Sequence, residues 1–489
     1  MNKLVFTPAY QLARMIKEGQ VSAVEVTQAY LNQISQYNSQ LNAVCTLNPE
    51  ALETAKQADA ALAKGENWGA LHGVPITIKD TFETAGLRTT AGYEPLKDYI
   101  PTEDATAVAR LRAAGAIILG KTSPSQLAGD YQGINDLFPR VNNPWNLEYT
   151  SGGSSSGGAA AVCAGLSPLD LASDNGGSIR QPAHFCGLYG LKPTDRRVPT
   201  TGHIGDTTTM DFRCIRQMFT VGCLARSIED LSLCIKLIAG ADARQPDIPP
   251  VPLDIEEKSL ENLRIAWIDQ IPVYPVAEEI KFAMQGVRKK LADALINVES
   301  WVPKYDFAHA WEVFYAVGTY NLIYTQPTDL KSVREQMAFL WREATQGDKS
   351  LRKISKVPNI SLPIFLQPSL KGYFAALTKR DNLIAQMDRE LEQWDVLLCP
   401  VAMTTAFTHR AKGAAIEIDG KKVPYQMANG AYIVPFNLTG HPVVVIPIGF
   451  TKDVPIGMQI VGKRWKEMEL LSIAGKLDRI IGGFRLPDY

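Results

Sequence analysis

Two glycine-rich loops hold the serines of this chain that are best placed to act as nucleophiles. The first loop is Gly152-Gly-Ser-Ser-Ser-Gly-Gly158, and the second is Asn175-Gly-Gly-Ser178, directly after a strand-like run that ends at Asp174. Successive glycines let backbone N–H groups converge on one point and form an anion-binding nest. A serine at the end of such a nest is suited to acyl transfer, in which negative charge develops on the attacked carbonyl oxygen.

Other interpretations of the two loops fit less well. Residues 153–157 have the form G-x-S-x-G around Ser155, but the preceding segment 142–150 is polar and contains Pro144. A nucleophile elbow requires a buried strand in that place. The second loop lacks the G-x-x-x-x-G-K-[ST] sequence of a nucleotide-binding loop. A flexible linker is a further alternative for the first loop, although Gly/Ser linkers do not usually separate two ordered blocks.

A nucleophilic serine needs a base, and the residues alone leave two types open. His184 follows Ser178 closely in the chain, but none of the six histidines stands in a context that marks it as a base. Lys79 ends an apolar strand-like segment, where burial lowers the pKa of an ammonium group and allows the neutral amine to accept a proton. At this point histidine and lysine remain equally good candidates.

The elements that position these residues alternate between strands and helices. Segment 73–80 alternates so that Lys79 lies on the opposite face from Ile76 and Ile78. Further strand-like runs are 116–120, 169–174, 394–400, 442–450 and 456–462, and a helical pattern covers 104–116. This alternation predicts an α/β protein. Because strands recur at the end of the chain, we expect one domain with a helical insertion.

The composition argues against several classes of protein. The 489 residues are 46% hydrophobic, and 50 Lys plus Arg against 51 Asp plus Glu give a net charge of −1. We therefore expect no nucleic-acid partner. No run reaches the ~18 apolar residues of a membrane span, and the N-terminus lacks a signal-peptide core. Seven scattered cysteines without zinc-finger spacing fit reduced thiols, so we expect a cytoplasmic protein without a structural metal.

Taken together, these segments resemble the amidase signature family. Residues 152–161, 174–182 and 190–194 resemble the family's long signature, and 73–80 resembles its lysine motif. Similarity continues at 221–231, 435–440 and 455–462, and it is weakest between 255 and 395. The resemblance implies a three-layer α/β/α fold with a central mixed, twisted sheet covered by helices. It implies a single amidase signature domain over 1–489, with a helical N-terminal cover at 1–65, a catalytic core at 66–250, a helical, variable insertion shaping the substrate pocket at 251–395, and a return to the core sheet at 396–489.

The resemblance also implies a role for individual residues. Ser178 is expected to be the nucleophile, Ser154 the bridging serine with the family's cis peptide bond, and Lys79 the base. The implied oxyanion hole consists of the backbone amides of Asn175, Gly176, Gly177 and Ser178. Asp174, Arg180 and Ser155 are expected to hold the loops without reacting. The chain departs from the usual family pattern at Ser123, Ser125, Gln126, Ser156, Gly158 and Asn175.

The implied activity is hydrolysis of a small-molecule amide through an acyl-enzyme, with no metal or organic cofactor. The main alternative is the glutamine-hydrolysing subunit of a tRNA-dependent amidotransferase, although residues 198–203 look more like general amidases. An inactive scaffold is a further alternative. Aromatic residues of the insertion favour a linear amide with an aryl or fatty group, while core packing explains any one of them: Phe314, Tyr315, Tyr320, Phe365, Tyr373 and Phe374. The sequence leaves the oligomeric state open, a homodimer included.

Overall fold

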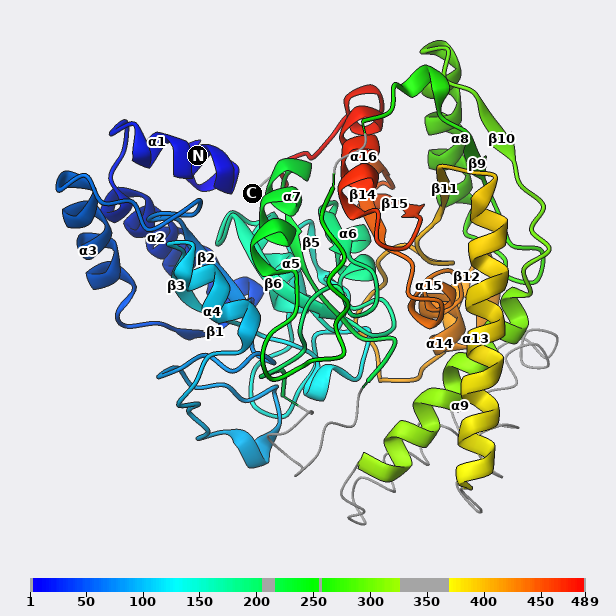
Figure 1. Cartoon of the computed structure of the whole chain (residues 1–489), viewed down its shortest axis with the longest axis horizontal. Helices are drawn as coiled ribbons and strands as arrows, with labels where there is room; N and C mark the ends of the chain where they lie inside the picture. The colour runs from blue at the N-terminus through cyan, green and yellow to red at the C-terminus, as the bar shows by residue number, and fades with distance from the viewer. Residues whose placement is uncertain (1–2, 205–215, 255–256, 326–368, 488–489) are drawn as a thin grey trace.

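The computed structural model describes residues 3–204, 216–254, 257–325 and 369–487, and a single large sheet runs through this part of the chain (Figure 1). Its 11 strands follow the order β1-β3-β2-β6-β8-β7-β14-β15-β11-β9-β10. The strands are β1 (Val44–Leu47), β2 (Pro75–Lys79), β3 (Ile117–Thr122), β6 (Leu169–Asp174), β7 (Tyr189–Lys192), β8 (Thr220–Ala225), β9 (Ile265–Trp267), β10 (Val298–Ser300), β11 (Val396–Pro400), β14 (Val443–Phe450) and β15 (Pro455–Gly462). β2 is parallel to β3 and β6, whereas β6, β8, β7, β14 and β15 pair antiparallel in turn. The predicted mixed sheet is therefore confirmed.

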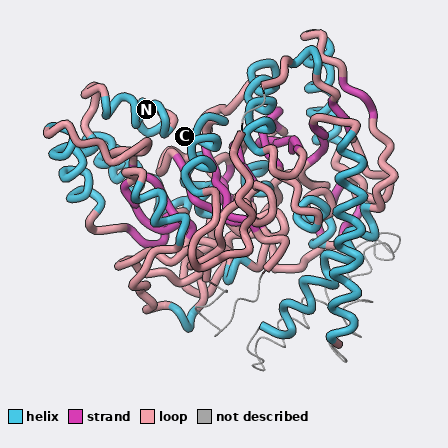
Figure 2. The backbone as a smooth tube through the Cα atoms, in the orientation of Figure 1, coloured by secondary structure: helices cyan, strands magenta, loops and turns pink. Residues whose placement is uncertain are grey.

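Helices cover this sheet, and Figure 2 shows the strands running between them. The helices are α1 (Ala9–Lys17), α2 (Ala23–Leu41), α3 (Ala51–Ala63), α4 (Thr106–Ala113), α5 (Ser156–Cys163), α6 (Arg180–Cys186), α7 (Ile228–Ile238), α8 (Glu278–Asp293), α9 (Phe307–Thr325), α13 (Leu370–Glu392), α14 (Tyr425–Gly430), α15 (Val434–Leu438) and α16 (Glu467–Ile481). Short 3-10 turns lie at Lys3–Phe6, Glu94–Leu96, Gln126–Ala128 and Leu260–Asn262, and two small hairpins pair β4 (Asn142–Asn143) with β5 (Asn146–Thr150) and β12 (Ile416–Ile418) with β13 (Lys421–Val423). The arrangement is the predicted α/β class.

All the strand-like runs of the sequence become strands of the large sheet. The predicted pairing of 442–450 with 456–462 is also present, because β14 and β15 form an antiparallel hairpin. The two segments expected to be helical supply strands as well. β1, from the N-terminal segment, pairs with β3, and β9 and β10, from the 251–395 segment, extend the opposite edge. Both segments are thus partly built into the sheet.

The strand that carries Lys79 is buried on both of its faces. Ile76 and Ile78 on one face, and Thr77 and Lys79 on the other, all have no exposed surface. A lysine at a strand end would ordinarily reach water, but here other elements cover that face as well. This burial determines the acid–base properties of its amine.

The helices α9 and α13 lie side by side at one end of the sheet (Figure 1). They contain five of the six aromatic residues singled out above, whereas Phe365 lies outside the described residues. No helix in the described ranges is both long and apolar enough to cross a membrane.

Candidate active site

The ends of two neighbouring parallel strands bring the site together. β2 ends at Lys79 and β6 ends at Asp174, and the two strands pair with Ile78 opposite Leu171. In α/β sheets, sites form at the carboxyl ends of strands, where the following loops meet. The two glycine-rich loops lie at this edge: the first runs into the start of α5 at Ser156, and the second precedes α6.

The Lys79 amine contacts two serine hydroxyl groups inside the protein. Its Nζ lies 2.8 Å from Ser154 Oγ and 3.1 Å from Ser173 Oγ. Burial lowers the pKa of Lys79 to about 7, against the opposing influence of the Asp170 and Asp174 charges. A large fraction of the amine is thus neutral near pH 7, as a general base requires.

Several backbone contacts fix the loop that carries Ser154. The Gly153–Ser154 peptide bond is cis, as the family resemblance implies. The Gly153 amide donates to the side-chain oxygen of Gln181 at 3.0 Å, and the Ser154 carbonyl accepts from the Ser125 amide at 3.1 Å. Ser125, a departure from the usual family pattern, therefore supports the loop through its backbone.

The second serine loop is tied to the first. The Ser155 amide donates to the Ser178 carbonyl at 3.2 Å. The Ser178 side chain is 8% exposed, whereas Ser154 is fully buried. Within the described part of the chain the Ser178 hydroxyl forms no hydrogen bond with Ser154. The structure thus joins Lys79 to Ser154 but leaves the second link of the expected triad open.

One of the four amides expected to form the oxyanion hole already donates a hydrogen bond within the loop. The Gly177 amide donates to the Asp174 carboxylate at 2.9 Å, so it points into the loop rather than toward a substrate. Gly177 has a φ of +115°, and a Cβ there would lie 2.8 Å from Ile433, which explains the need for glycine. Among the described residues, the amides of Asn175, Gly176 and Ser178 have no acceptor. These three amides are therefore the donors available to an oxyanion.

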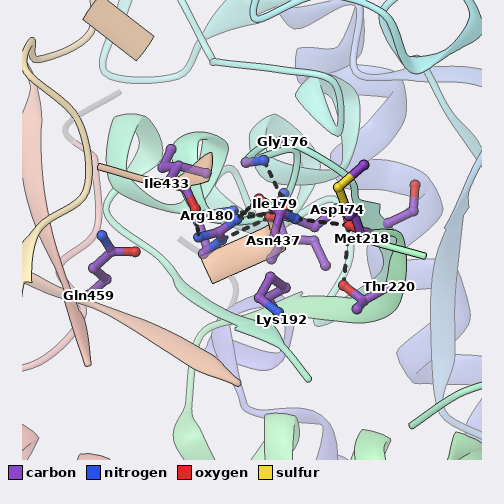
Figure 3. Close-up of polar contacts among 12 residues, drawn as sticks. Asp174, Gly176, Ile179, Arg180, Lys192, Met218, Thr220, Ile433, Asn437 and Gln459 are labelled. Carbon is purple, nitrogen blue, oxygen red and sulfur yellow. Dashed lines mark hydrogen bonds and ion pairs between the residues drawn. The ribbon is translucent and has the colours of Figure 1, made fainter. Parts of the chain in front are cut away.

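A buried ion pair holds this loop from behind. Arg180 donates to both oxygens of Asp174, through Nε at 3.1 Å and Nη2 at 3.0 Å. Asn437 of α15 donates to the same carboxylate at 2.9 Å, and Arg180 also donates to the Ile433 carbonyl at 2.9 Å. Figure 3 shows these groups converging on Asp174. Burial alone would raise the pKa of Asp174, but Arg180 and Asn437 outweigh it and hold that pKa well below its ordinary value.

A second carboxylate explains the glycine at position 158. Asp170 accepts from the Thr77 hydroxyl at 2.8 Å and from the Thr122 hydroxyl at 2.9 Å, and burial raises its pKa to about 7. A Cβ on Gly158 would lie 2.1 Å from an Asp170 carboxylate oxygen. The departure from the usual small polar residue at this position therefore makes room for Asp170.

His184, the histidine candidate for the base, is engaged elsewhere. Its Nδ1 accepts from the Gly457 amide at 2.7 Å, and its Nε2 lies 3.1 Å from the Thr404 carbonyl. Burial lowers the pKa of His184 to about 4. Both ring nitrogens therefore hold the fold together, and neither is free to serve Ser178.

Sequence reasoning missed two residues beside Lys79. Ser173 contacts the Lys79 amine, and its Oγ lies 3.1 Å from His203 Nε2. The available signal was weak, consisting of one hydroxyl residue in the apolar run of β6 and a histidine far away in the chain.

Other features of the described residues lie away from this site. A cavity of about 300 Å³ contains none of the residues proposed for catalysis. Its lining is Thr194, Asp195, Arg196, Arg380, Asp381, Ile384, Ala385, Asp388, Thr439, Gly440, Arg464 and Trp465. Within the described ranges, no group of three or more His, Cys, Asp or Glu side chains is arranged to hold a metal ion.

A fold and a site of this kind are characteristic of enzymes that hydrolyse amides, and comparison with known proteins assigns the family. The family model described as Amidase matches residues 25–471. The chain belongs to the amidase family, and amide hydrolysis is the chemistry this membership supports.

Curated relatives match nearly the whole chain. The glutamyl-tRNA(Gln) amidotransferase A subunit of Acinetobacter baumannii (strain AYE) is 33% identical over 486 residues, which cover 95% of this chain and 94% of the relative. Its counterpart of the same name in Roseiflexus sp. (strain RS-1) is 32% identical over 492 residues, covering 97% of this chain and 96% of the relative.

Solved structures show the same fold. The 6-aminohexanoate cyclic dimer hydrolase in complex with its substrate has a TM-score of 0.80 and 25% identity, with 99% of each chain covered. The native peptide amidase from Stenotrophomonas maltophilia has a TM-score of 0.77 and 24% identity, with 99% of this chain and 98% of that chain covered. The expected amidase signature fold is thereby confirmed.

Proposed function

We propose that this protein hydrolyses a carboxylic amide to a carboxylate and ammonia or an amine, through an acyl-enzyme on Ser178. Lys79 is the base and Ser154 is the relay between the base and the nucleophile. The contact of 2.8 Å between Lys79 Nζ and Ser154 Oγ is the main support, because it places a buried amine with a pKa of about 7 on a serine beside the nucleophile loop.

The proposed reaction begins with proton transfer. Neutral Lys79 takes a proton from Ser154, which takes one from Ser178, and the Ser178 oxygen attacks the amide carbonyl carbon. The amides of Asn175, Gly176 and Ser178 donate to the resulting oxyanion. Ser154 then passes a proton to the leaving nitrogen as the C–N bond breaks, and water hydrolyses the acyl-enzyme. Catalytic hydrogen bonds often tighten only in the substrate complex, so we assign the Ser154–Ser178 bond to that state.

Aromatic groups beside the oxyanion loop favour an apolar acyl or aryl group on the substrate. A Cβ on Gly176 would lie 3.6 Å from Phe314 Cζ and 3.6 Å from the Tyr131 hydroxyl oxygen. Tyr131 also donates to the Gly176 carbonyl at 2.7 Å, which fixes its ring next to the loop. Phe314 comes from α9, so the segment 251–395 supplies part of this wall. That origin fits its predicted role in shaping the substrate pocket of a single domain.

The first test uses a serine-reactive fluorophosphonate and intact-mass measurement. We expect a single adduct on the wild-type protein, no adduct on Ser178→Ala, and strongly slowed labelling of Lys79→Ala. An adduct that persists on Ser178→Ala would place the nucleophile elsewhere and refute the proposed mechanism. Hydrolysis of aryl and fatty amides by the same variants then tests the substrate class.

The alternative function is glutamine hydrolysis within a tRNA-dependent amidotransferase. The curated relatives that carry this name, at 33% identity over nearly the full length, favour it. Ammonia release from glutamine is measured with and without the partner subunits of such a complex. Release that requires those subunits, together with inactivity on aryl amides, would support this alternative over an independent amidase. A homodimer remains a prediction for which light scattering is the direct test.

A further inference from the structure

A chain of three hydrogen-bonded groups extends from the proposed base to a histidine. Lys79 Nζ lies 3.1 Å from Ser173 Oγ, and Ser173 Oγ lies 3.1 Å from His203 Nε2. Lys79 is fully buried, and Ser173 and His203 are 1% and 6% exposed. Because bulk water scarcely reaches these groups, they satisfy one another, and the direction of each hydrogen bond matters.

Packing and backbone contacts fix the His203 ring. It stands edge to face between Phe82, at a ring-centroid distance of 4.9 Å, and Phe219, at 4.6 Å. The Ile204 amide donates to the Thr81 carbonyl at 2.7 Å, which holds this loop against the segment that follows Lys79. The ring therefore has a set position relative to the Lys79 strand end.

The protonation of this ring follows from its surroundings. Burial, and then the nearby Lys79 charge, lowers the pKa of His203 to about 3, so the ring is neutral at ordinary pH. A hydrogen bond with the Ile204 backbone raises that pKa, as expected when a ring N–H donates to a carbonyl group. We assign this donor role to Nδ1, the ring nitrogen that does not contact Ser173. Nε2 then carries a lone pair and accepts the Ser173 proton.

A neutral amine has two protons and one lone pair, so its partners decide which serine it can deprotonate. When Ser173 donates to His203, its oxygen can only accept from Lys79. The Lys79 lone pair is then left for the Ser154 hydroxyl. If His203 donated from Nε2 instead, the Ser173 proton would turn toward Lys79 and occupy that lone pair.

We infer that His203 is a positioning residue for the proposed triad, because it orients the Ser173 hydroxyl and thereby directs the Lys79 lone pair to Ser154. This inference rests on the proposed function, since it assigns an orientation to the same base. The arrangement serves both protonation states, because the ammonium form of Lys79 also donates to Ser173 while Ser173 still donates to His203.

The test replaces His203 with a ring that cannot accept a hydrogen bond. His203→Phe keeps an aromatic ring between Phe82 and Phe219, and His203→Gln retains an amide oxygen as a substitute acceptor. The fluorophosphonate labelling rate of Ser178 is measured by intact mass from about pH 5.5 to about pH 9.5, a range that brackets the ionisation of the base. His409→Phe is the control, since His409 is a half-buried histidine that contacts the Leu147 carbonyl at 3.2 Å.

In His203→Phe we expect the limiting labelling rate at high pH to fall roughly tenfold. The variant loses the hydrogen bond from Ser173 to His203, which directs the Lys79 lone pair to Ser154. The apparent pKa of the labelling profile moves down, because a Ser173 proton without another acceptor pairs with the neutral amine and stabilises it. His203→Gln recovers part of the rate, and the control keeps the wild-type profile.

The results separate this inference from the proposed function. An unchanged rate and pKa in His203→Phe would overturn the inference, and so would a slower rate with an unshifted pKa and no recovery in His203→Gln. Labelling that persists in Ser178→Ala refutes the proposed function instead. If His203→Phe does not fold, Ser173→Ala is the deciding variant. It removes an acceptor of the ammonium form, so the apparent pKa must fall, while the limiting rate at high pH stays near that of the wild type because no Ser173 proton competes for the Lys79 lone pair. An unchanged pKa, or a limiting rate as low as the one expected for His203→Phe, would overturn the inference.

Discussion

Replacing Lys79 with methionine should abolish activity and, at the same time, stabilise the protein in a pH-dependent way. Methionine has nearly the shape of lysine but no charge to desolvate. The pKa of Lys79 is about 7 in the folded protein, against about 10.4 in an unfolded chain. The unfolded chain therefore binds the Lys79 proton more tightly than the folded protein does. The buried lysine lowers stability at every pH at which the unfolded chain carries that proton.

The magnitude follows from this difference in pKa. At pH 6 the shift of about 3.4 units corresponds to a penalty of about 5 kcal/mol in the free energy of unfolding. At pH 9 only the unfolded chain still binds the proton, and the penalty is about 2 kcal/mol. It vanishes above the unfolded pKa. The stability difference between Lys79→Met and wild type should therefore shrink by about 3 kcal/mol between pH 6 and pH 9. The Ser154 and Ser173 hydroxyls lose a partner at every pH, so that cost cancels in the comparison.

Urea denaturation at the two pH values measures this change, and fluorophosphonate labelling of Ser178 measures activity. The matched control is Lys192→Met. Lys192 is also buried with a pKa lowered to about 7, but its Nζ donates to the Pro193 carbonyl at 2.9 Å and contacts neither Ser154 nor Ser178. The control should show the same pH-dependent stabilisation and keep its labelling. A stability difference for Lys79→Met that is constant from pH 6 to pH 9 would refute a lowered pKa, and with it the basis for lysine as the base.

Two further predictions concern the groups around the site. Arg180→Met leaves the Asp174 charge buried without its cation. We expect the free energy of unfolding, measured by urea denaturation at pH 7, to fall by about 3–5 kcal/mol, and Ser178 labelling to slow. A fall of less than about 1 kcal/mol would mean that the pair does not stabilise the loop. Gly158→Ala places a Cβ 2.1 Å from an Asp170 oxygen and should destabilise the protein, by about 1–3 kcal/mol. Its control is Gly286→Ala on α8, where a Cβ meets nothing within 4 Å, and this variant should be stabilised by about 0.5–1 kcal/mol. Equal stability of the two alanine variants would contradict the close contact at Gly158.

Features fixed by neighbouring residues were predictable from the sequence. The strand that ends at Lys79 follows from alternating apolar residues, and the two serine loops follow from their glycines, because these signals are local. The choice of lysine over histidine was not local. It came from family resemblance, and the structure supports it by showing both nitrogens of His184 bonded to the backbone.

Partners from distant parts of the chain were not predictable from one sequence. Asn437 holds Asp174 from 263 residues away, and no pattern near either residue indicates the other. The hydrogen bond of the Gly177 amide within the loop was easier to predict. An aspartate commonly accepts hydrogen bonds from amides two or three residues later. The position of Asp174 therefore predicts that one of the four loop amides donates to its carboxylate.

The end of β6 contacts both the proposed base and the proposed oxyanion loop. Successive side chains of a strand point to opposite faces, so Ser173 and Asp174 must diverge. Ser173 contacts the Lys79 amine, while Asp174 contacts Arg180 and the Gly177 amide of the loop. The base and the oxyanion loop are therefore oriented by adjacent residues of the same rigid element. A one-residue shift in the pairing of β6 would exchange the two faces and remove both supports at once, which ties the placement of Lys79 and of the Ser178 loop to a single feature of the sheet.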